Sequence, residues 1–212
     1  MSKVCIIIPA FNEELSVGKV IFESKNYGDI VVINDGSTDK TSAISKKYGA
    51  KVINNRTNLG YDKTILKGIN YALDKSYDYI LTLDADGQHP SETIPYFINY
   101  IKKKEYNLVI GCRNYYPRFS EKFFNYYSDK FYSIPDVLCG MKCYTSDFLR
   151  KCNHEKFINS IGTYYLFEAA KKKLKIKFIK IKVCNRQFNS SKMGLNFIAN
   201  FKIFKAFFKI FI

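Results

Sequence analysis

The sequence predicts an α/β fold in which a doubly wound, mostly parallel sheet carries helices on both faces. Three observations lead to this prediction. The 212 residues, 47% hydrophobic and 25% charged, are enough for one globular domain with its own core. Short apolar runs alternate with segments of helical period in the first half, as parallel βαβ units require. No linker rich in Pro, Gly or Ser and no internal repeat divides the chain, so both halves are expected to share one core.

The elements of the first half follow from this alternation. Apolar runs predict strands at 4–8, 30–33, 51–53, 79–83 and 108–110. Helical period predicts helices at about 13–25, 39–48, 61–75 and 91–104. Within 61–75, for example, Ile65, Ile69 and Ala72 stand at spacings of four and three residues.

The second half is less regular. Residues 113–135 are aromatic and basic without a clear period, which is typical of a loop or a short helix. A strand at 137–144, a helix near 160–173 and a strand at 175–184 are predicted to follow.

The net charge of +15 comes entirely from the second half, where 23 Lys and Arg stand against 7 Asp and Glu. Such a bias indicates a polyanionic partner, either nucleic acid or an anionic membrane, and the alternative is a lysine-rich solvated surface. The six cysteines form no CxxC pair and are expected to be buried, reduced thiols. The apolar run at 4–8 is too short for a signal peptide, which predicts the cytoplasmic side.

Residues 195–212 are apolar except for two asparagines and three lysines. On a helix, Lys202, Lys205 and Lys209 fall within a sector of about 60°. Lysines near the centre make spanning a bilayer costly, by about 2.5–3.5 kcal/mol each. A basic amphipathic helix lying on an anionic membrane surface is therefore predicted, and packing on the domain or on a second subunit is the alternative.

Three polar, turn-forming loops follow predicted strands at 9–14, 34–39 and 84–90, and the carboxyl ends of parallel strands are where such sheets bind ligands. Asp84 and Asp86 repel each other unless a cation lies beside them. Mg²⁺ or Mn²⁺ suits this pair, because it takes oxygen from carboxylates and from substrate phosphates. Gln88 adds a carbonyl oxygen, and His89 is expected to be a turn residue before Pro90. Aspartates in turns and helix caps also produce D-x-D triplets, so the strand-end position carries the prediction.

Asp35 ends the second predicted strand. Its carboxylate could accept a hydrogen bond from the imide N–H of uracil or guanine, and Gly36 would let a flat ring approach the backbone. Pro9 and Phe11 could line the other side of that ring, with Glu13 close to the base or ribose. The alternative role of Asp35 is to cap the helix that follows.

Four ordered blocks of this sequence, 7–14, 32–41, 58–60 and 82–90, resemble family 2 glycosyltransferases, whose GT-A fold is a Rossmann-like sheet. Residues 111–113, 136–142, Arg186 and Ser191-Lys192 resemble the branch of polyprenyl-phosphate sugar synthases, as in dolichol-phosphate mannose synthases. The resemblance implies a glycosyltransferase domain at 1–194, with a nucleotide-sugar half at 1–112 and an acceptor half at 113–194.

The resemblance also implies roles for single positions. Nucleotide-sugar binding falls on Pro9, Ala10, Phe11, Glu13, Ile33, Asp35, Asp84, Ala85 and Asp86, and the metal on Asp84, Asp86 and Gln88. Catalytic roles fall on Asp84, Asp86, Arg113, Arg186 and Lys192, and contacts to the acceptor phosphate on Lys142, Arg186, Ser191 and Lys192. Lys142 departs from the family pattern, which usually has arginine there, and so loses a bidentate fork for phosphate.

The activity implied is inverting, metal-dependent transfer of a hexose from a UDP- or GDP-sugar to a polyprenyl phosphate, by an enzyme on the inner face of the membrane. A lipid phosphate is ionised at pH 7 and needs no base. The alternative acceptor, a saccharide hydroxyl in cell-envelope polysaccharide synthesis, needs a carboxylate base, for which Asp136 and Glu168 are the candidates. A basic nucleic-acid-binding module is a remote alternative, and no nucleic-acid partner is expected because no known motif spacing supports one. The sequence predicts neither the base nor the oligomeric state.

Overall fold

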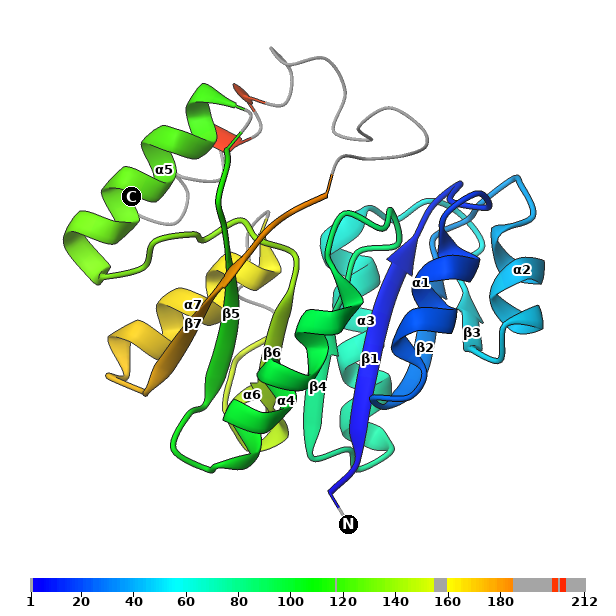
Figure 1. Cartoon of the computed structure of the whole chain (residues 1–212), viewed down its shortest axis with the longest axis horizontal. Coiled ribbons are helices and arrows are strands. Elements are labelled where there is room, and N and C mark those ends of the chain that lie inside the picture. The colour runs from blue at the N-terminus through cyan, green and yellow to red at the C-terminus, as the bar shows by residue number, and fades with distance from the viewer. Residues whose placement is uncertain (1, 117, 155–159, 185–199, 202, 205–212) are drawn as a thin grey trace.

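The computed structural model describes residues 2–116, 118–154, 160–184, 200–201 and 203–204 (Figure 1). Within these residues a seven-stranded sheet has the order β3-β2-β1-β4-β6-β5-β7. The strands are β1 (Val4–Ala10), β2 (Asp29–Asn34), β3 (Lys51–Asn54), β4 (Tyr79–Thr82), β5 (Leu108–Arg113), β6 (Lys142–Thr145) and β7 (Ile176–Ile181). The helices are α1 (Val17–Ser24), α2 (Thr41–Lys47), α3 (Tyr61–Asp74), α4 (Ile94–Lys102), α5 (Phe119–Tyr132), α6 (Ser146–Arg150) and α7 (Ile161–Lys171), with a 3-10 turn at Ser91–Thr93.

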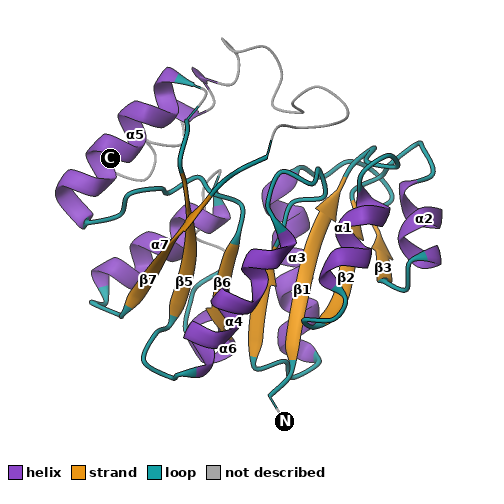
Figure 2. Cartoon of the chain, viewed as in Figure 1, coloured by secondary structure: helices purple, strands orange, loops and turns teal. Residues whose placement is uncertain are grey.

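All neighbouring strands are parallel except β6, which is antiparallel to both β4 and β5. Because β6 runs in the opposite direction, its first residue, Lys142, lies at the edge where the parallel strands end. The predicted fold class, a mostly parallel sheet between layers of helices, is confirmed (Figure 2).

The core consists of one apolar layer on each face of the sheet, and β1 contributes to both. Ile6 and Ile8 pack with residues of α1 and α4, whereas Cys5 and Ile7 pack with residues of α3 and α7. Each layer contains residues from both halves of the chain. Among the described residues, no helix has the length and apolar character needed to cross a bilayer.

The structure differs from the sequence prediction mainly in the second half. The segment predicted to be a loop or short helix contains α5, a helix of 14 residues. Its period is hidden because its buried side is largely polar. The strand predicted at 137–144 begins only at Lys142, and the short helix α6, capped by the Thr145 hydroxyl, was not predicted. Five cysteines are buried as expected, but Cys184 is exposed.

Candidate active site

The loops that follow β1 and β2 are tied to each other at the carboxyl edge of the sheet. The backbone N–H of Asn12 donates to the Ser37 hydroxyl (3.0 Å), and that of Thr38 donates to the Asn12 side-chain oxygen (2.9 Å). The backbone N–H of Glu13 donates to the Thr41 hydroxyl (2.8 Å). These reciprocal bonds fix both loops, so that the positions predicted to hold a nucleoside belong to one ordered surface.

Asp35 lies at the end of β2, is buried, and holds the loop between β3 and α3. Its Oδ1 accepts hydrogen bonds from the Asn55 amide and from the Leu59 N–H (both 2.8 Å), and its Oδ2 accepts one from the Gly60 N–H (3.0 Å). Gly36, at φ +72°, approaches this loop so closely that a Cβ would lie 2.7 Å from the carbonyl carbon of Thr57. A carboxylate oxygen can accept two hydrogen bonds, so Oδ2 keeps capacity for one more.

The other predicted nucleoside positions lie beside Asp35, in different environments. Pro9 and Ile33 are partners across the β1–β2 pair, and Ile33 is fully buried in the layer under α3, so only its backbone can face a ligand. Ala10 is also buried, and Phe11 is half-buried. The Glu13 carboxylate is buried and accepts a hydrogen bond from the Ser16 hydroxyl (3.0 Å).

Asp84 follows β4 and contacts residues from three different parts of the chain. Its Oδ1 accepts a hydrogen bond from the hydroxyl of Tyr61, the first residue of α3, at 3.1 Å. Its Oδ2 lies 3.6 Å from Nδ1 of His89. On a third side is Gly140, where a Cβ would lie 2.7 Å from the Asp84 Cγ. The Thr82 hydroxyl holds Gly140 in place by donating to its carbonyl (2.7 Å). Only a residue without a side chain fits here.

Asp86 and Gln88 complete the predicted metal-binding loop. The Asp86 Oδ1 accepts the Gln88 backbone N–H (3.0 Å), and buried Ala85 separates Asp86 from Asp84. Gln88 is paired with Cys184 in the segment that follows β7. The Gln88 side-chain amide donates to the Cys184 carbonyl (3.4 Å), and the Gln88 backbone carbonyl accepts the Cys184 N–H (2.9 Å). Gln88 therefore keeps its side-chain oxygen as an acceptor.

Carboxylate and amide oxygens are the ligand types that a hard divalent cation takes, and Asp84, Asp86 and Gln88 supply both types from one loop. No three His, Cys, Asp or Glu side chains among the described residues lie close enough together to hold a metal by themselves. Two carboxylates and an amide oxygen would leave further positions for phosphate oxygens and water, as Mg²⁺ and Mn²⁺ sites commonly have. The Asp84 side chain is 28% exposed and can be reached by such a ligand.

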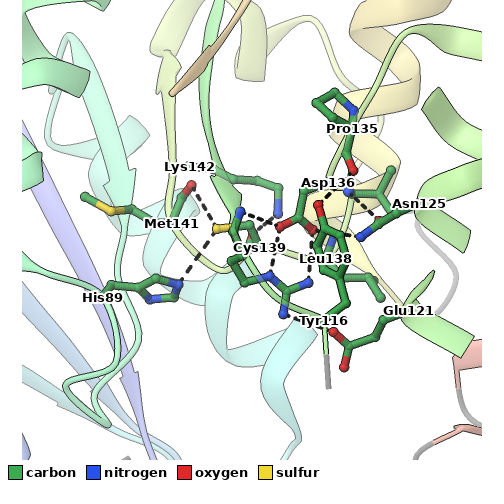
Figure 3. Close-up of polar contacts among 12 residues, drawn as sticks. His89, Tyr116, Glu121, Asn125, Pro135, Asp136, Leu138, Cys139, Met141 and Lys142 are labelled. Carbon is green, nitrogen blue, oxygen red and sulfur yellow. Dashed lines mark hydrogen bonds and ion pairs between the residues drawn. The ribbon is translucent and has the colours of Figure 1, made fainter. Parts of the chain in front are cut away.

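His89, predicted to be a turn residue, is part of this site. It is buried, and its Nε2 lies 3.8 Å from the sulfur of Cys139 (Figure 3). Burial opposes protonation, but the contact with Cys139 and the nearby Asp84 and Asp86 carboxylates raise the pKa of His89 to about 9. Tyr61, His89 and Gly140 are the residues around Asp84 that sequence reasoning did not assign to the site. His89 carried a signal, since it lies in the same loop as Asp84, and so did Gly140, which lies in the 136–142 block of the family resemblance.

Arg113 and Asp136 form a buried pair next to this site. The Arg113 Nε and Nη2 donate to the Asp136 carboxylate at 2.8 and 3.0 Å, and Nη1 lies 3.1 Å from Glu121 of α5. Asp136 is fully buried and also accepts the backbone N–H of Arg113 (3.0 Å) and of Leu138 (3.2 Å). Burial disfavours the charged guanidinium, but the hydrogen bonds and charge of Asp136 raise the pKa of Arg113 above its usual value.

This geometry argues against two roles expected from the sequence. A base must reach the acceptor hydroxyl, but the Asp136 carboxylate is enclosed and engaged by Arg113 and by backbone N–H groups (Figure 3). Glu168, the second candidate, pairs with Lys172 (3.7 Å). The first residue of α7, Ile161, lies beside α3, because its N–H donates to the Asp62 carboxylate. Glu168 comes seven residues later and is therefore about 10 Å along the helix from this end.

The predicted phosphate-binding residues are only partly described. Lys142 is buried, its Nζ donates to the Cys139 carbonyl, and burial lowers its pKa. In this arrangement Lys142 supports the 139–142 segment instead of facing solvent. Arg186, Ser191 and Lys192 lie outside the described residues, as do most of residues 195–212.

The fold and the strand-end carboxylates together are those of a GT-A glycosyltransferase. A family model, glycosyl transferase family 2, matches residues 5–174, and the chain belongs to this family. The family inferred from the four sequence blocks is thereby confirmed.

Individual relatives agree with this assignment. The UDP-N-acetylglucosamine–dolichyl-phosphate N-acetylglucosaminyltransferase of Methanococcus voltae is 27% identical over 94% of this chain and 92% of its own length. The undecaprenyl-phosphate mannosyltransferase of Micrococcus luteus is 25% identical over 91% and 88%, respectively. Among solved structures, glucosyl-3-phosphoglycerate synthase from Mycobacterium tuberculosis, with Mn²⁺, UDP and glucosyl-3-phosphoglycerate, superimposes with a TM-score of 0.79. It covers 99% of this chain and 78% of that one at 14% identity, which shows a shared fold.

The contact between Gly140 and Asp84 can be tested with a single methyl group. Gly140→Ala should lower the transfer rate by about tenfold or more, because the new Cβ displaces the Asp84 carboxylate from its position. Gly49→Ala is the control, since no atom lies within 4 Å of the Gly49 Cβ position, although Gly49, unlike Gly140, has a positive φ (+93°). It should cost about 1–2 kcal/mol of stability through backbone strain without slowing transfer. Equal rates for both variants would show that the Asp84 position is not critical.

Proposed function

We propose that this protein transfers a hexose from a UDP- or GDP-sugar to a polyprenyl phosphate with inversion at the anomeric carbon. The observation that carries the proposal is the Asp84 carboxylate, held by Tyr61 and Gly140 beside Asp86 at the carboxyl edge of a GT-A sheet. The names of the Methanococcus voltae and Micrococcus luteus relatives support the acceptor class, since both name a polyprenyl phosphate.

On the donor side, Asp84, Asp86 and Gln88 would hold Mg²⁺ or Mn²⁺ against the diphosphate. When bound, such a cation neutralises the negative charge that grows on the leaving nucleoside diphosphate. Tyr61 and His89 orient Asp84 from either side, so the carboxylate needs little reorganisation. The complex of glucosyl-3-phosphoglycerate synthase with Mn²⁺ and UDP supports this assignment. The base would lie near Asp35, Pro9, Phe11 and Glu13, with the spare acceptor capacity of Asp35 Oδ2 toward its imide N–H.

On the acceptor side, a phosphate is favoured over a saccharide hydroxyl. A phosphate oxygen is ionised at pH 7 and attacks without a base, whereas a hydroxyl needs one. Of the two carboxylates considered as that base, Asp136 is enclosed and Glu168 is far along α7. Arg113, Arg186, Ser191 and Lys192 remain the proposed phosphate-binding residues, and Lys142 would contribute only if it left its buried position. A peripheral location on the cytoplasmic face of the membrane, with residues 195–212 on anionic lipid, belongs to the same proposal.

A transfer assay tests this function directly. Purified protein is incubated with labelled UDP- or GDP-hexoses, Mg²⁺ or Mn²⁺, and undecaprenyl phosphate in detergent, and the label is followed into the organic phase. We expect a labelled lipid that mild acid hydrolyses, and its loss when EDTA is added. Transfer to an oligosaccharide primer with none to the lipid would overturn the acceptor class, and undiminished transfer in EDTA would overturn the role of the metal.

A further inference from the structure

The surface helix α5 exposes aromatic residues to solvent and buries mostly polar ones. Its buried residues are Ser120, Glu121, Asn125 and Ser128, together with one apolar residue, Phe124. Its exposed residues include Phe119, Phe123 and Tyr126, which are 72%, 43% and 66% exposed. At 100° per residue, these three aromatic residues and Lys130 fall within a sector of about 60°. A surface helix normally has the opposite arrangement.

The polar side of α5 fixes the aromatic side outward. The Glu121 carboxylate forms ion pairs with Arg118 (2.6 Å) and Arg113 (3.1 Å). The pair with Arg113 connects the helix to the end of β5. The Asn125 side-chain oxygen accepts the Val137 N–H (3.2 Å), and the Ser128 hydroxyl donates to the Ile134 carbonyl (2.8 Å). Turning the helix to bury its aromatic residues would break these buried bonds, each of which is costly to leave unpaired.

The described residues near the C-terminus extend the aromatic side. Asn200 accepts hydrogen bonds from the N–H (3.2 Å) and hydroxyl (2.5 Å) of Ser120, and the Phe204 ring lies 5.8 Å from that of Phe123. Phe201, on the same helical stretch, is 66% exposed. We call the surface made by Phe119, Phe123 and Tyr126 the aromatic face.

We propose that the aromatic face docks on an anionic bilayer and brings the site to a lipid acceptor. Phenylalanine and tyrosine beside lysine suit the boundary between acyl chains and headgroups. Lys122 and Lys130 of α5 are exposed next to the face, although Asp129 is exposed as well. The half of the chain that carries the face also carries the charge excess, 23 basic against 7 acidic residues, which is complementary to anionic lipid.

The position of α5 agrees with this role. It lies beyond the carboxyl end of β5, at the same end of the sheet as the loops that follow β1 and β4 (Figure 1). A membrane at the aromatic face would therefore be next to the site edge. The link to an acceptor rests on the proposed function, whereas docking itself does not.

A single introduced tryptophan tests the docking. The chain contains no tryptophan, so Tyr126→Trp carries a unique fluorophore on the aromatic face. Its emission should shift to the blue when vesicles of phosphatidylglycerol and phosphatidylcholine are added, and brominated lipid should quench it. Phe22→Trp is the matched control, because Phe22 is 58% exposed on α1 and lies beside Lys25. A shift equal to that of the control would overturn the proposal.

A triple variant, Phe119→Ser with Phe123→Ser and Tyr126→Ser, should weaken vesicle binding by about tenfold or more, as measured by sedimentation. Phe22→Ser with Tyr96→Ser should leave binding unchanged. Unchanged binding of the triple variant would overturn the proposal, as would a wild-type dimer that the triple variant converts to a monomer without losing vesicle binding. The triple variant should still act on detergent-solubilised acceptor. Tryptophan insertion without any transfer by the wild type would contradict the proposed function alone, and transfer without insertion would contradict the docking alone.

Discussion

Asp84→Asn should lower the rate of sugar transfer by about 100-fold or more while the protein stays folded. Asparagine has the shape of aspartate, and its side-chain oxygen can still accept the hydrogen bond from Tyr61. It has no charge to hold a divalent cation against a diphosphate. Asp86→Ala should have a comparable effect, because it removes the second carboxylate. Initial rates at saturating donor and acceptor, with thermal unfolding of each variant, provide the measurement.

Asp78→Asn is the matched control. Asp78 is a carboxylate that follows α3, far from the carboxyl edge, and accepts the backbone N–H of Lys3 at 2.7 Å. Its replacement should change transfer by less than about twofold, since exposed charge contacts contribute little. Near-normal turnover of Asp84→Asn and Asp86→Ala with Mg²⁺ or Mn²⁺ would remove the metal-binding role of this loop.

Asp136→Ala should lower the free energy of unfolding by about 3–5 kcal/mol. It leaves the guanidinium of Arg113 buried, 15% exposed, with Glu121 as its remaining carboxylate partner. It also removes the acceptor of the Arg113 and Leu138 backbone N–H groups. Urea unfolding followed by circular dichroism gives the difference directly. Glu168→Gln is the control, because its pair with Lys172 is 24% and 43% exposed and should change stability by less than about 1 kcal/mol.

The same variants separate the two acceptor classes. If the acceptor is a lipid phosphate, the fraction of Asp136→Ala that is folded at low temperature should keep transferring sugar, and so should Glu168→Gln. Because Asp136 also holds Arg113 in place, a complete loss of transfer in a well-folded Asp136→Ala protein would favour a hydroxyl acceptor only if Arg113→Ala, which leaves the Asp136 carboxylate present, still transfers sugar. The concentration of folded protein is measured by donor binding, so that a loss of stability is not mistaken for a loss of catalysis.

The sequence predicted those features of the fold that depend on local pattern. The apolar runs that became β1, β2, β4 and β5 are buried on both faces and give a clear strand pattern. The loop that follows β2 contains Asp35 and the loop that follows β4 contains Asp84 and Asp86, as expected. Features that depend on contacts between distant residues could not be predicted. Gly140 meets Asp84 only because β6 runs antiparallel to β4, and no spacing in the chain indicates that direction.

Two further failures have physical causes. The helical period of α5 was missed because polar residues occupy its buried side and satisfy one another through Arg113, Glu121 and Asn125. Asp136 was considered as a base because its sequence neighbours do not reveal that it is buried opposite Arg113, 23 residues away. A search for apolar periodicity cannot detect either arrangement, since both depend on the pairing of buried charges.

Asp136, the partner of Arg113, is separated from Lys142 by five residues, and the length of this segment is fixed by contacts at both of its ends. At one end, Asp136 and Val137 are held by Asn125 of α5, and at the other, Gly140 touches the Asp84 carboxylate. An inserted or deleted residue between these anchors would move a side chain into the place of the glycine even if every other position were retained. Tolerance to insertions should therefore be low here, although the segment has no regular secondary structure.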